Sequence, residues 1–240
     1  MARKKKELPL LQSISIEGIA GEGKALTHVN GQVLFVPFAA PGDVCDIQVT
    51  KKKSSFMEGR ITEIITPSPQ RVTPICSHFT ICGGCKWQHL PYSLQLETKD
   101  QVVRDALCRI GKIDVETYLP ILGSERTERY RNKLEFTFSH RRWLQPNEFS
   151  ALDEREGQDL SGLGFHLPGM FDKVLDIDQC HLGAEVLDDI RLFIRDYCKA
   201  RPERYPYFDL RKQEGFMRTL MMRTTSMGEI MLVVVFFRED

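Results

Sequence analysis

The chain has 240 residues, 42% of them hydrophobic, and its equal numbers of basic and acidic residues give a formal net charge of zero. This is the composition of an ordinary globular protein, and the length favours two domains with separate cores. No apolar run approaches the roughly 18 to 20 residues that cross a bilayer, and the basic start MARKKKELPL lacks the apolar stretch of a secretory signal. We therefore expect a cytoplasmic protein with no membrane contact.

The zero net charge conceals an uneven distribution. Residues 1–142 contain 21 Lys and Arg against 15 Asp and Glu, whereas residues 143–240 contain 12 against 18. The basic part is where an anionic partner would bind, although an unevenly charged solvated surface also explains so small an excess.

A basic tail at residues 1–7 precedes a series of short β runs. The expected strands cover residues 13–17, 24–30, 32–38, 44–52 and 56–65. Asn30-Gly31 and Pro41-Gly42 separate three of them, and Asn-Gly is typical of a tight hairpin because both central residues of a type I′ turn need positive φ. Five strands in about 55 residues predict a small closed barrel of the OB type within residues 8–70.

Prolines at 67, 69 and 74 indicate a linker or a domain edge after the barrel. Residues 92–110 have apolar side chains near helical spacing, and Gly111 is placed to end that helix as a left-handed cap. A second strand-rich region follows, with the runs KLEFTFS, WLQP, LGFHL and KVLDID.

Residues 185–199, EVLDDIRLFIRDYCK, predict an amphipathic helix. Its apolar face is expected to contain Val186, Ile190, Phe193, Ile194 and Tyr197. The later run IMLVVVFF predicts a strand, which either closes the domain at a sheet edge or belongs to a longer chain.

Three of the seven cysteines lie within ten residues, in Cys76-Ser-His-Phe-Thr-Ile-Cys82-Gly-Gly-Cys85. Thiolates this close bind zinc, bind an iron–sulfur cluster or carry redox chemistry, and a disulfide framework is disfavoured without an export signal. Gaps of five and two residues are more typical of cluster-binding runs, since only the last pair has zinc-site spacing. Gly83 and Gly84 suit either metal site, because backbone without Cβ can approach sulfur closely.

A cubane cluster needs a fourth ligand, and four cysteines are available. Cys45 and Cys108 lie in a predicted strand and a predicted helix, where each is expected to be a small buried hydrophobic residue. Cys198 lies at a helix end, where a thiol is unremarkable. Cys180 follows the predicted strand KVLDID at an element boundary, so position alone favours it.

Five motifs in this order resemble those of the bacterial 23S rRNA uracil-5-methyltransferases. They are the cysteine run, Gln88-His89, Tyr130-Arg131-Asn132-Lys133, GFH at 164–166, and DIDQCHL around Cys180. The resemblance extends from about Leu11 to the end, and it implies a β-rich, multi-domain protein. An amino-terminal TRAM domain, which is an OB-like RNA-binding barrel, would occupy residues 8–70. A central α+β domain would occupy residues 71–90 and 112–240, and the helix at 91–111 would pack on a catalytic domain.

The resemblance implies that Cys76, Cys82, Cys85 and Cys180 hold a [4Fe–4S] cluster, which selects the same fourth cysteine as position did. It also implies S-adenosylmethionine as the methyl donor, bound in a C-terminal domain that carries a nucleophilic Cys and a Glu base. No glycine-rich strand-to-helix turn in these 240 residues could bind that cofactor instead. We therefore expect the RNA-binding and iron–sulfur portion of the enzyme, inactive alone.

Two groups of basic residues could hold RNA. In the predicted barrel they are Lys24, Lys51, Lys52 and Lys53, for which a solvated turn is an equal alternative. Phe35 and Phe38 could stack on bases there, although core packing is the better explanation of both.

The second group surrounds a predicted hairpin and consists of Arg129, Arg131, Lys133, Arg141 and Arg142. Strand alternation would put the first three on one face, and Arg131 and Lys133 are the first candidates. We expect a monomer that binds RNA and not DNA, with ribosomal RNA as the substrate. His78, His89 and His166 are expected to be hydrogen-bonded structural residues.

The alternative is a stand-alone RNA-binding module with a structural four-cysteine metal site, holding zinc or an iron–sulfur cluster, and no catalysis. In either case the metal is expected to be structural. Radical enzymes use gaps of three and two residues with three cysteines, which keeps one iron free, and that spacing is not present here.

Overall fold

The computed structural model describes residues 8–145, 148 and 159–239, so the predicted tail at 1–7 and Pro146 of the predicted WLQP strand lie outside it. The chain forms two compact units. Unit 1 comprises Met1–Ile75 and Cys85–Ser124, and unit 2 comprises Cys76–Gly84 and Glu125–Asp240. Residues 71–75, 85–90 and 112–124, which were expected in the central domain, therefore group with unit 1.

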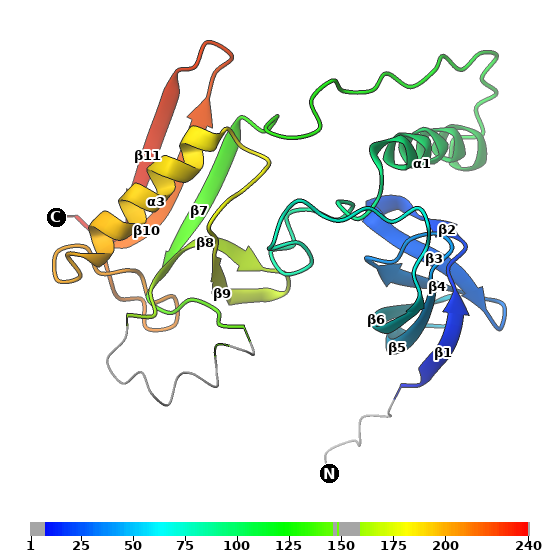
Figure 1. Cartoon of the computed structure of the whole chain (residues 1–240), viewed down its shortest axis with the longest axis horizontal. Helices are drawn as coiled ribbons and strands as arrows, with labels where there is room; N and C mark the ends of the chain where they lie inside the picture. Colours follow the sequence, from blue (N-terminus) through cyan, green and yellow to red (C-terminus); the bar gives the residue numbers. More distant parts are fainter. Residues whose placement is uncertain (1–7, 146–147, 149–158, 240) are drawn as a thin grey trace. The chain divides into compact units, whose positions relative to one another are not determined.

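A curled six-stranded sheet forms most of unit 1 (Figure 1). Its strands are β1 (Leu10–Ser15), β2 (Gly18–Ile19), β3 (Lys24–Val29), β4 (Gln32–Pro37), β5 (Val44–Lys52) and β6 (Phe56–Thr66). Their order across the sheet is β1-β5-β6-β4-β3-β2. Neighbours are antiparallel except β4 and β6, which pair in parallel. The five predicted strands are confirmed, and the short β2 is additional.

The predicted hairpin turn is confirmed in its backbone. Asn30 and Gly31 have φ values of 51° and 78°, and both must be positive in a type I′ turn. The second predicted turn has Gly42 at φ 87°, where the Asp43 N–H donates to the Ala40 carbonyl at 3.0 Å. Both turns thus use residues that tolerate the left-handed region.

Alternate residues of these strands form the core of unit 1. The buried set is Ile16, Ala25, Leu34, Val36, Ala39, Cys45, Ile47, Val49 and Met57. Because strand side chains alternate between faces, the intervening residues point outward.

A buried carboxylate attaches the linker to this sheet. Asp43 is 0% exposed, and Arg71 donates to it from Nε at 2.8 Å and from Nη2 at 2.6 Å. The backbone N–H groups of Ala40 and Ser68 donate to the same carboxylate at 2.6 and 2.8 Å. Burial acts to raise the pKa of Asp43, but the hydrogen bonds from Arg71, Ala40 and Ser68 outweigh it and hold the pKa below its ordinary value.

The predicted helix after the cysteine run is confirmed as α1 (Tyr92–Asp105), followed by a π-helical turn, η2 (Ala106–Ile110). The left-handed cap expected at Gly111 is wrong, since its φ is −72° and the positive φ falls on Lys112 at 54°. Gly111 is instead needed for close approach, because a Cβ there would lie 2.9 Å from the Leu107 carbonyl oxygen.

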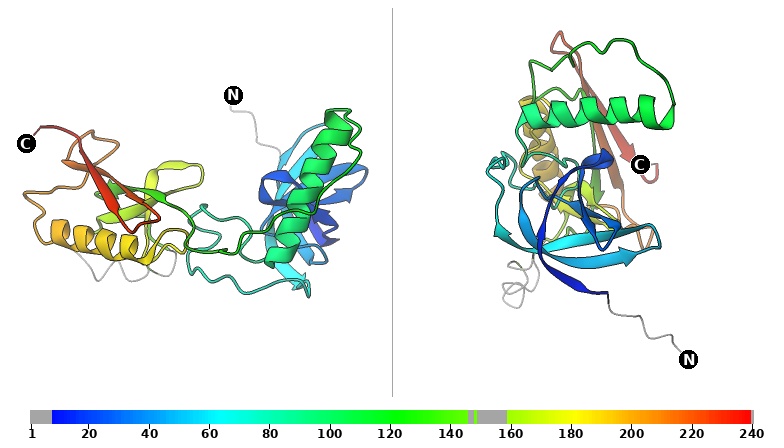
Figure 2. Two further views of the ribbon diagram at one scale, coloured as in Figure 1. Left: turned by 90° about the horizontal axis from the view of Figure 1, so that it is seen from above. Right: turned by 90° about the vertical axis from the view of Figure 1, so that its right-hand side faces the viewer.

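Unit 2 contains an antiparallel sheet covered on one face by a helix (Figure 2). The strands are β7 (Lys133–Ser139), β8 (Gly162–Leu167), β9 (Met170–Asp176), β10 (Met217–Thr224) and β11 (Ile230–Phe236), and the helix is α3 (Glu185–Lys199). Their order is β11-β10-β7-β8-β9, which confirms the run IMLVVVFF as an edge strand. β10 was not predicted, and Trp143 and Leu144 of the predicted WLQP strand lie outside the strands. Within the described ranges, no helix combines the length and apolar character needed to cross a membrane.

The predicted buried face of α3 is wrong. The buried residues are Leu187, Asp188, Arg191 and Cys198. Val186, Phe193 and Tyr197, which were expected in the core, are 40%, 69% and 40% exposed. Ile190 and Ile194 do pack against the core. Two charged residues inside the protein shift the buried face away from the one that hydrophobic periodicity selects.

We predict that Asp43→Asn destabilises unit 1 by about 3 kcal/mol at neutral pH, because it leaves Arg71 without its buried carboxylate. Since folding lowers the pKa of Asp43, its contribution is present above the unfolded value of about 3.9 and is lost as pH falls through the folded value. The variant should therefore lose part of the acid sensitivity of the parent. Urea unfolding followed by Trp87 fluorescence, in a Trp143→Phe background, measures both effects.

Glu63→Gln is the matched control, because Glu63 is exposed on the same sheet and its change should alter stability by less than about 0.5 kcal/mol. Equal unfolding midpoints for the Asp43 and Glu63 variants would contradict the prediction.

Candidate cysteine site and nucleic-acid interface

The first two cysteines of the run lie in a compact loop of unit 2. The Phe79 N–H donates to the Cys76 carbonyl at 3.1 Å, and the Ile81 and Cys82 N–H groups donate to the His78 carbonyl at 3.2 and 3.0 Å. These bonds wind the five residues between Cys76 and Cys82 into two successive turns. Both thiols therefore originate from one locally hydrogen-bonded segment.

The two glycines after Cys82 have distinct reasons to lack a side chain. Gly83 has φ 74°, and a Cβ there would overlap Cγ of Pro168. A Cβ on Gly84 would lie 3.4 Å from Sγ of Cys82. The glycine at 84 thus leaves backbone close to a thiol, as expected where main chain approaches sulfur.

The backbone of Cys180 is held on both sides. Its N–H donates to the two carboxylate oxygens of Asp188 at 3.0 and 3.1 Å, and its carbonyl accepts from Nη1 of Arg129 at 2.8 Å. The same Arg129 nitrogen donates to the Gly183 carbonyl at 3.0 Å and lies 3.3 Å from Asp188 Oδ2. Asp188 and Arg129 therefore fix the position of the Cys180 backbone, from which its side chain extends.

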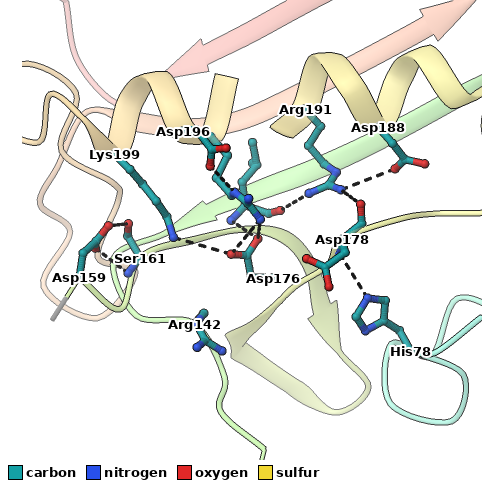
Figure 3. A network of polar contacts seen from close by, with 12 residues as sticks. His78, Arg142, Asp159, Ser161, Asp176, Asp178, Asp188, Arg191, Asp196 and Lys199 are labelled. Carbon is teal, nitrogen blue, oxygen red and sulfur yellow. Dashed lines mark hydrogen bonds and ion pairs between the residues drawn. The ribbon is translucent and has the colours of Figure 1, made fainter. Parts of the chain in front are cut away.

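A polar network joins the cysteine loop to the strand end before Cys180 (Figure 3). The Asp178 N–H donates to Nε2 of His78 at 3.2 Å, and the Asp178 carbonyl accepts from Nη2 of Arg191 at 2.9 Å. Arg191 also lies 3.6 Å from Asp188 Oδ1. His78 is 9% exposed, so it is a buried, hydrogen-bonded residue as expected.

Three of the four proposed ligands, Cys76, Cys82 and Cys180, belong to unit 2. Burial raises the pKa of Cys180 and the charge of Asp188 acts in the same direction, whereas backbone hydrogen bonds from Leu182 and Gly183 act in the opposite direction. None of the seven cysteines forms a disulfide. Cys85 begins the segment that returns to unit 1, and chain length keeps its Cα within about 11 Å of the Cα of Cys82.

The thiol-rich donor set and the glycines suit a soft metal or an iron–sulfur cluster. In the part of the chain that the structure describes, however, no three His, Cys, Asp or Glu side chains are grouped as metal ligands. The assembly of all four cysteines around one group therefore stays a prediction.

The other three cysteines occupy different environments. Cys45 is 0% exposed in the core of unit 1, where burial raises its pKa to about 11, which confirms its expected role as a small hydrophobic residue. Cys198 belongs to the last turn of α3 and is buried, and burial raises its pKa. The expectation for Cys108 is wrong, because η2 leaves this residue exposed, with its Sγ 3.1 Å from the Tyr118 hydroxyl.

The outward face of β4 and β6 carries two aromatic rings beside two lysines. Phe35 and Phe56 meet edge to face with centroids 6.0 Å apart. Nζ of Lys51 and of Lys53 lie 5.5 and 5.6 Å from the Phe56 centroid. Core packing is thus the wrong explanation for Phe35, which alternates with buried Leu34. Sequence reasoning missed Phe56, although its position across a tight turn from the lysine run was a usable signal.

A carboxylate reduces the positive charge on this face. Glu58 lies 3.9 Å from Lys24 and 3.4 Å from Lys51. Both lysines remain partly exposed, and Lys52 and Lys53 are exposed at the end of β5 and just beyond it. This face therefore combines aromatic rings with exposed cations.

The basic residues of unit 2 divide into buried and exposed ones. Arg129 is only 20% exposed and is occupied by Cys180 and Asp188. Arg131 is exposed, and its Nε donates to the Lys133 carbonyl at 3.2 Å. Because β7 begins at Lys133, strand alternation does not extend to Arg129 and Arg131. Arg131 and Lys133 remain available at the start of this strand.

Arg141 and Arg142 differ in the same way. Arg141 is exposed, whereas Arg142 donates to Glu148 at 2.8 Å. Lys133 is also 3.4 Å from Glu135. Of the five basic residues predicted here, Arg131 and Arg141 present the most accessible guanidinium groups.

The loop after Cys85 is hydrogen-bonded to other residues of unit 1. Nε2 of His89 lies 3.1 Å from the Ala39 carbonyl, and the Val72 N–H donates to the His89 carbonyl at 3.0 Å. Burial lowers the pKa of His89, so the ring is neutral at pH 7 and donates to Ala39. A Cβ on Gly23 would lie 3.0 Å from the Trp87 indole nitrogen, which shows how closely this loop packs.

We predict that Gly83→Ala destabilises unit 2 by more than Gly169→Ala does. Both glycines have φ 74°, so both variants incur about 1 to 2 kcal/mol of backbone strain, but only the Cβ at 83 overlaps Pro168. An Ala at 169 would meet nothing within 4 Å. Urea unfolding of the two variants side by side, followed by Trp143 fluorescence in a Trp87→Phe background, measures the difference. Equal losses would show that the approach to Pro168 is unimportant.

The model of the TRAM domain matches residues 11–62 of this chain. The match covers β1 to most of β6, so the curled sheet of unit 1 is a TRAM domain.

Relatives match almost the whole chain. A Porphyromonas gingivalis protein named uncharacterized RNA methyltransferase is 64% identical, over 95% of this chain and 49% of its own length. A Bacteroides thetaiotaomicron protein of the same name is 47% identical, over 90% of this chain and 47% of its own. The chain thus spans about half the length of the curated relatives it matches.

A solved structure shares the fold. The crystal structure of Pyrococcus abyssi tRNA (uracil-54, C5)-methyltransferase in complex with S-adenosyl-L-homocysteine matches with a TM-score of 0.61 and 23% identity, over 95% of this chain and 47% of that one. At this identity the likeness concerns the fold alone. Through its TRAM domain and its relatives from Porphyromonas gingivalis and Bacteroides thetaiotaomicron, the chain belongs to the family of proteins named uncharacterized RNA methyltransferases.

Proposed function

We propose that this chain is the RNA-binding and iron–sulfur portion of an S-adenosylmethionine-dependent RNA (uracil-C5)-methyltransferase that acts on 23S rRNA. The observation that carries the proposal is a TRAM domain followed by a cysteine run of cluster type, in a chain 64% identical to a protein named an RNA methyltransferase. The uracil-C5 assignment is supported by the sequence motifs. Pyrococcus abyssi tRNA (uracil-54, C5)-methyltransferase also has a similar fold.

In this proposal the half of the longer relatives that this chain does not span binds S-adenosylmethionine and performs the chemistry. A Cys thiolate adds to C6 of uracil, which makes C5 nucleophilic enough to take the methyl group of S-adenosylmethionine, leaving S-adenosylhomocysteine. A base then removes the C5 proton as the C6–S bond breaks, which restores the C5=C6 double bond and releases the thiolate. The target base must first leave its stack, at a cost of a few kcal/mol. The task of this chain is to offset that cost with RNA contacts.

Unit 1 supplies one set of contacts if its curled sheet works as an OB-like barrel. Phe35 and Phe56 would stack on bases, while Lys51, Lys52 and Lys53 would neutralise phosphates. Lys24 is a weaker candidate because Glu58 lies beside it. In unit 2, Arg131 and Lys133 remain the first candidates, and Arg141 is the next candidate.

The ligands proposed for the [4Fe–4S] cluster are Cys76, Cys82, Cys85 and Cys180. The spacing of the cysteine run and the presence of Cys76, Cys82 and Cys180 in one compact unit support this assignment. When bound, the cluster would supply a cross-link between the cysteine run and the strand end at Cys180. Four protein thiolates leave no open iron, so its role would be structural.

The helix at 91–111 is proposed to pack on the catalytic half. Exposed apolar residues support this, since Val102, Val103 and Ile110 are 41%, 53% and 82% exposed. The alternative function is a stand-alone RNA-binding module with a structural zinc or iron–sulfur site. Both functions predict RNA binding and differ in whether a methyltransferase half is present.

Anaerobically purified protein should contain about four iron and four sulfide per chain if the cluster is present. Cys180→Ser should lower both contents, whereas Cys108→Ser should not, because Cys108 is exposed on η2 in unit 1. Iron, acid-labile sulfide and zinc analysis of the freshly isolated protein measures this. Stoichiometric zinc without sulfide would overturn the cluster and leave the zinc-containing module.

RNA binding should weaken steeply with salt, because phosphate contacts release counterions. Replacing Arg131 and Lys133 by Ala should reduce the slope of log Kd against log salt by about 1.4, which is the contribution of two contacts to a single strand. Replacing Arg142 by Ala is the control, since this residue is paired with Glu148. Fluorescence anisotropy with a labelled ribosomal RNA fragment measures the slopes, and identical slopes in all three proteins would exclude this surface.

A further inference from the structure

The outward face of α3 carries a row of aromatic side chains that the core does not use. Phe193 is 69% exposed and Tyr197 is 40% exposed. The Phe193 and Tyr197 centroids are 6.0 Å apart, and Tyr197 lies 5.8 Å from Tyr205. Three neighbouring rings thus line one surface at the C-terminal end of the helix. An isolated exposed ring is ordinary, but adjacent exposed rings indicate a binding surface.

Two arginines lie on these rings. The Arg201 guanidinium is 4.0 Å from the Tyr197 centroid, and that of Arg204 is 5.4 Å from the Tyr205 centroid. Among the residues that the structure describes, neither guanidinium has a carboxylate within ion-pair distance. Nη1 of Arg201 donates to the Tyr197 carbonyl at 3.1 Å. This bond covers one carbonyl at the C-terminal end of α3, where the negative end of the helix dipole would otherwise repel an anion.

Arg201 and Arg204, which follow α3 in the chain, differ from two basic residues of α3 that are paired with carboxylates. Arg195 and Lys199 lie 3.5 and 3.8 Å from Asp176, and Arg195 also pairs with Asp196. Their charges are therefore balanced inside the protein. The charges of Arg201 and Arg204 remain for an external anion.

We infer that these five residues, Phe193, Tyr197, Arg201, Arg204 and Tyr205, bind an unpaired segment of RNA. Bases would stack on the exposed rings of Phe193 and Tyr197, and phosphates would contact the two arginines. Aromatic rings combined with unpaired arginines are what single-stranded RNA sites use, because every base has a π face and every phosphate a negative charge. The inference rests on the proposed function, in that the partner is RNA, and it adds to unit 2 a surface that is separate from Arg131, Lys133 and Arg141.

Replacing Phe193 and Tyr197 by Ala should weaken binding of fluorescein-labelled oligouridine, measured by anisotropy, by about tenfold for each ring. Phe171→Ala is the matched control. Phe171 is 72% exposed in the same unit, and no ring or arginine contact joins it to another described residue. The control should bind as the parent does.

A second pair of variants tests the cations. Arg201→Gln with Arg204→Gln should reduce the slope of log Kd against log salt by about 1.4, whereas exposed Lys212→Gln should leave it unchanged. Circular dichroism and urea unfolding establish that all variants remain folded, as expected for exposed positions.

The outcomes separate the two proposals. If the parent chain does not bind RNA, the proposed function fails together with this surface. If the parent binds and the α3 variants match the Phe171 and Lys212 controls, only the α3 surface is overturned. Selective loss in the α3 variants, with the controls unchanged, supports it.

Discussion

The guanidinium of Arg191 places a positive charge inside the core of unit 2, and such a charge costs several kcal/mol unless partners surround it. Arg191 is 0% exposed, donates to the Leu163 and Asp178 carbonyls at 3.3 and 2.9 Å, and pairs with Asp188. Burial lowers the pKa of Arg191, but the group stays charged because an arginine side chain does not lose its proton in proteins. Asp188 must therefore be buried as well, and the same carboxylate accepts the Cys180 N–H. The position of the proposed fourth ligand thus depends on the need to neutralise one buried charge.

The first unit could be predicted from its sequence because its signals are local. Alternation of side chains with a period of two predicted the five strands. Asn30-Gly31 predicted a type I′ turn, because both residues tolerate the positive φ that this turn needs. The chemistry that the spacing of the cysteine run predicts stays a prediction. The ends of elements were less predictable: Gly111 ends its helix through close packing, which only the folded chain shows.

The second unit was harder because long-range polar contacts decide it. Hydrophobic periodicity selected Val186, Phe193 and Tyr197 of α3 for the core, but burial of Arg191 and Asp188 turned another side inward. β10 was missed because Met, Arg and Thr alternate in it without a plain apolar pattern. Arg129 resembled its basic neighbours in the sequence, and its bonds to Cys180 and Asp188 distinguish it only in three dimensions.

The buried pair of Asp43 and Arg71 shows that the segment matched as a TRAM domain and the segment that packs as one unit end at different residues. Residue 62, where the TRAM match ends, precedes Arg71 by nine positions, yet Arg71 supplies two of the hydrogen bonds to a carboxylate that is 0% exposed. The Val72 N–H and the His89 side chain add further contacts beyond the match. A segment that ended at residue 62 would contain Asp43 without Arg71, so the negative charge of this carboxylate would lack its basic partner. The matched segment therefore ends before a residue on which its own buried carboxylate depends, and the linker that carries Arg71 belongs to the same compact unit.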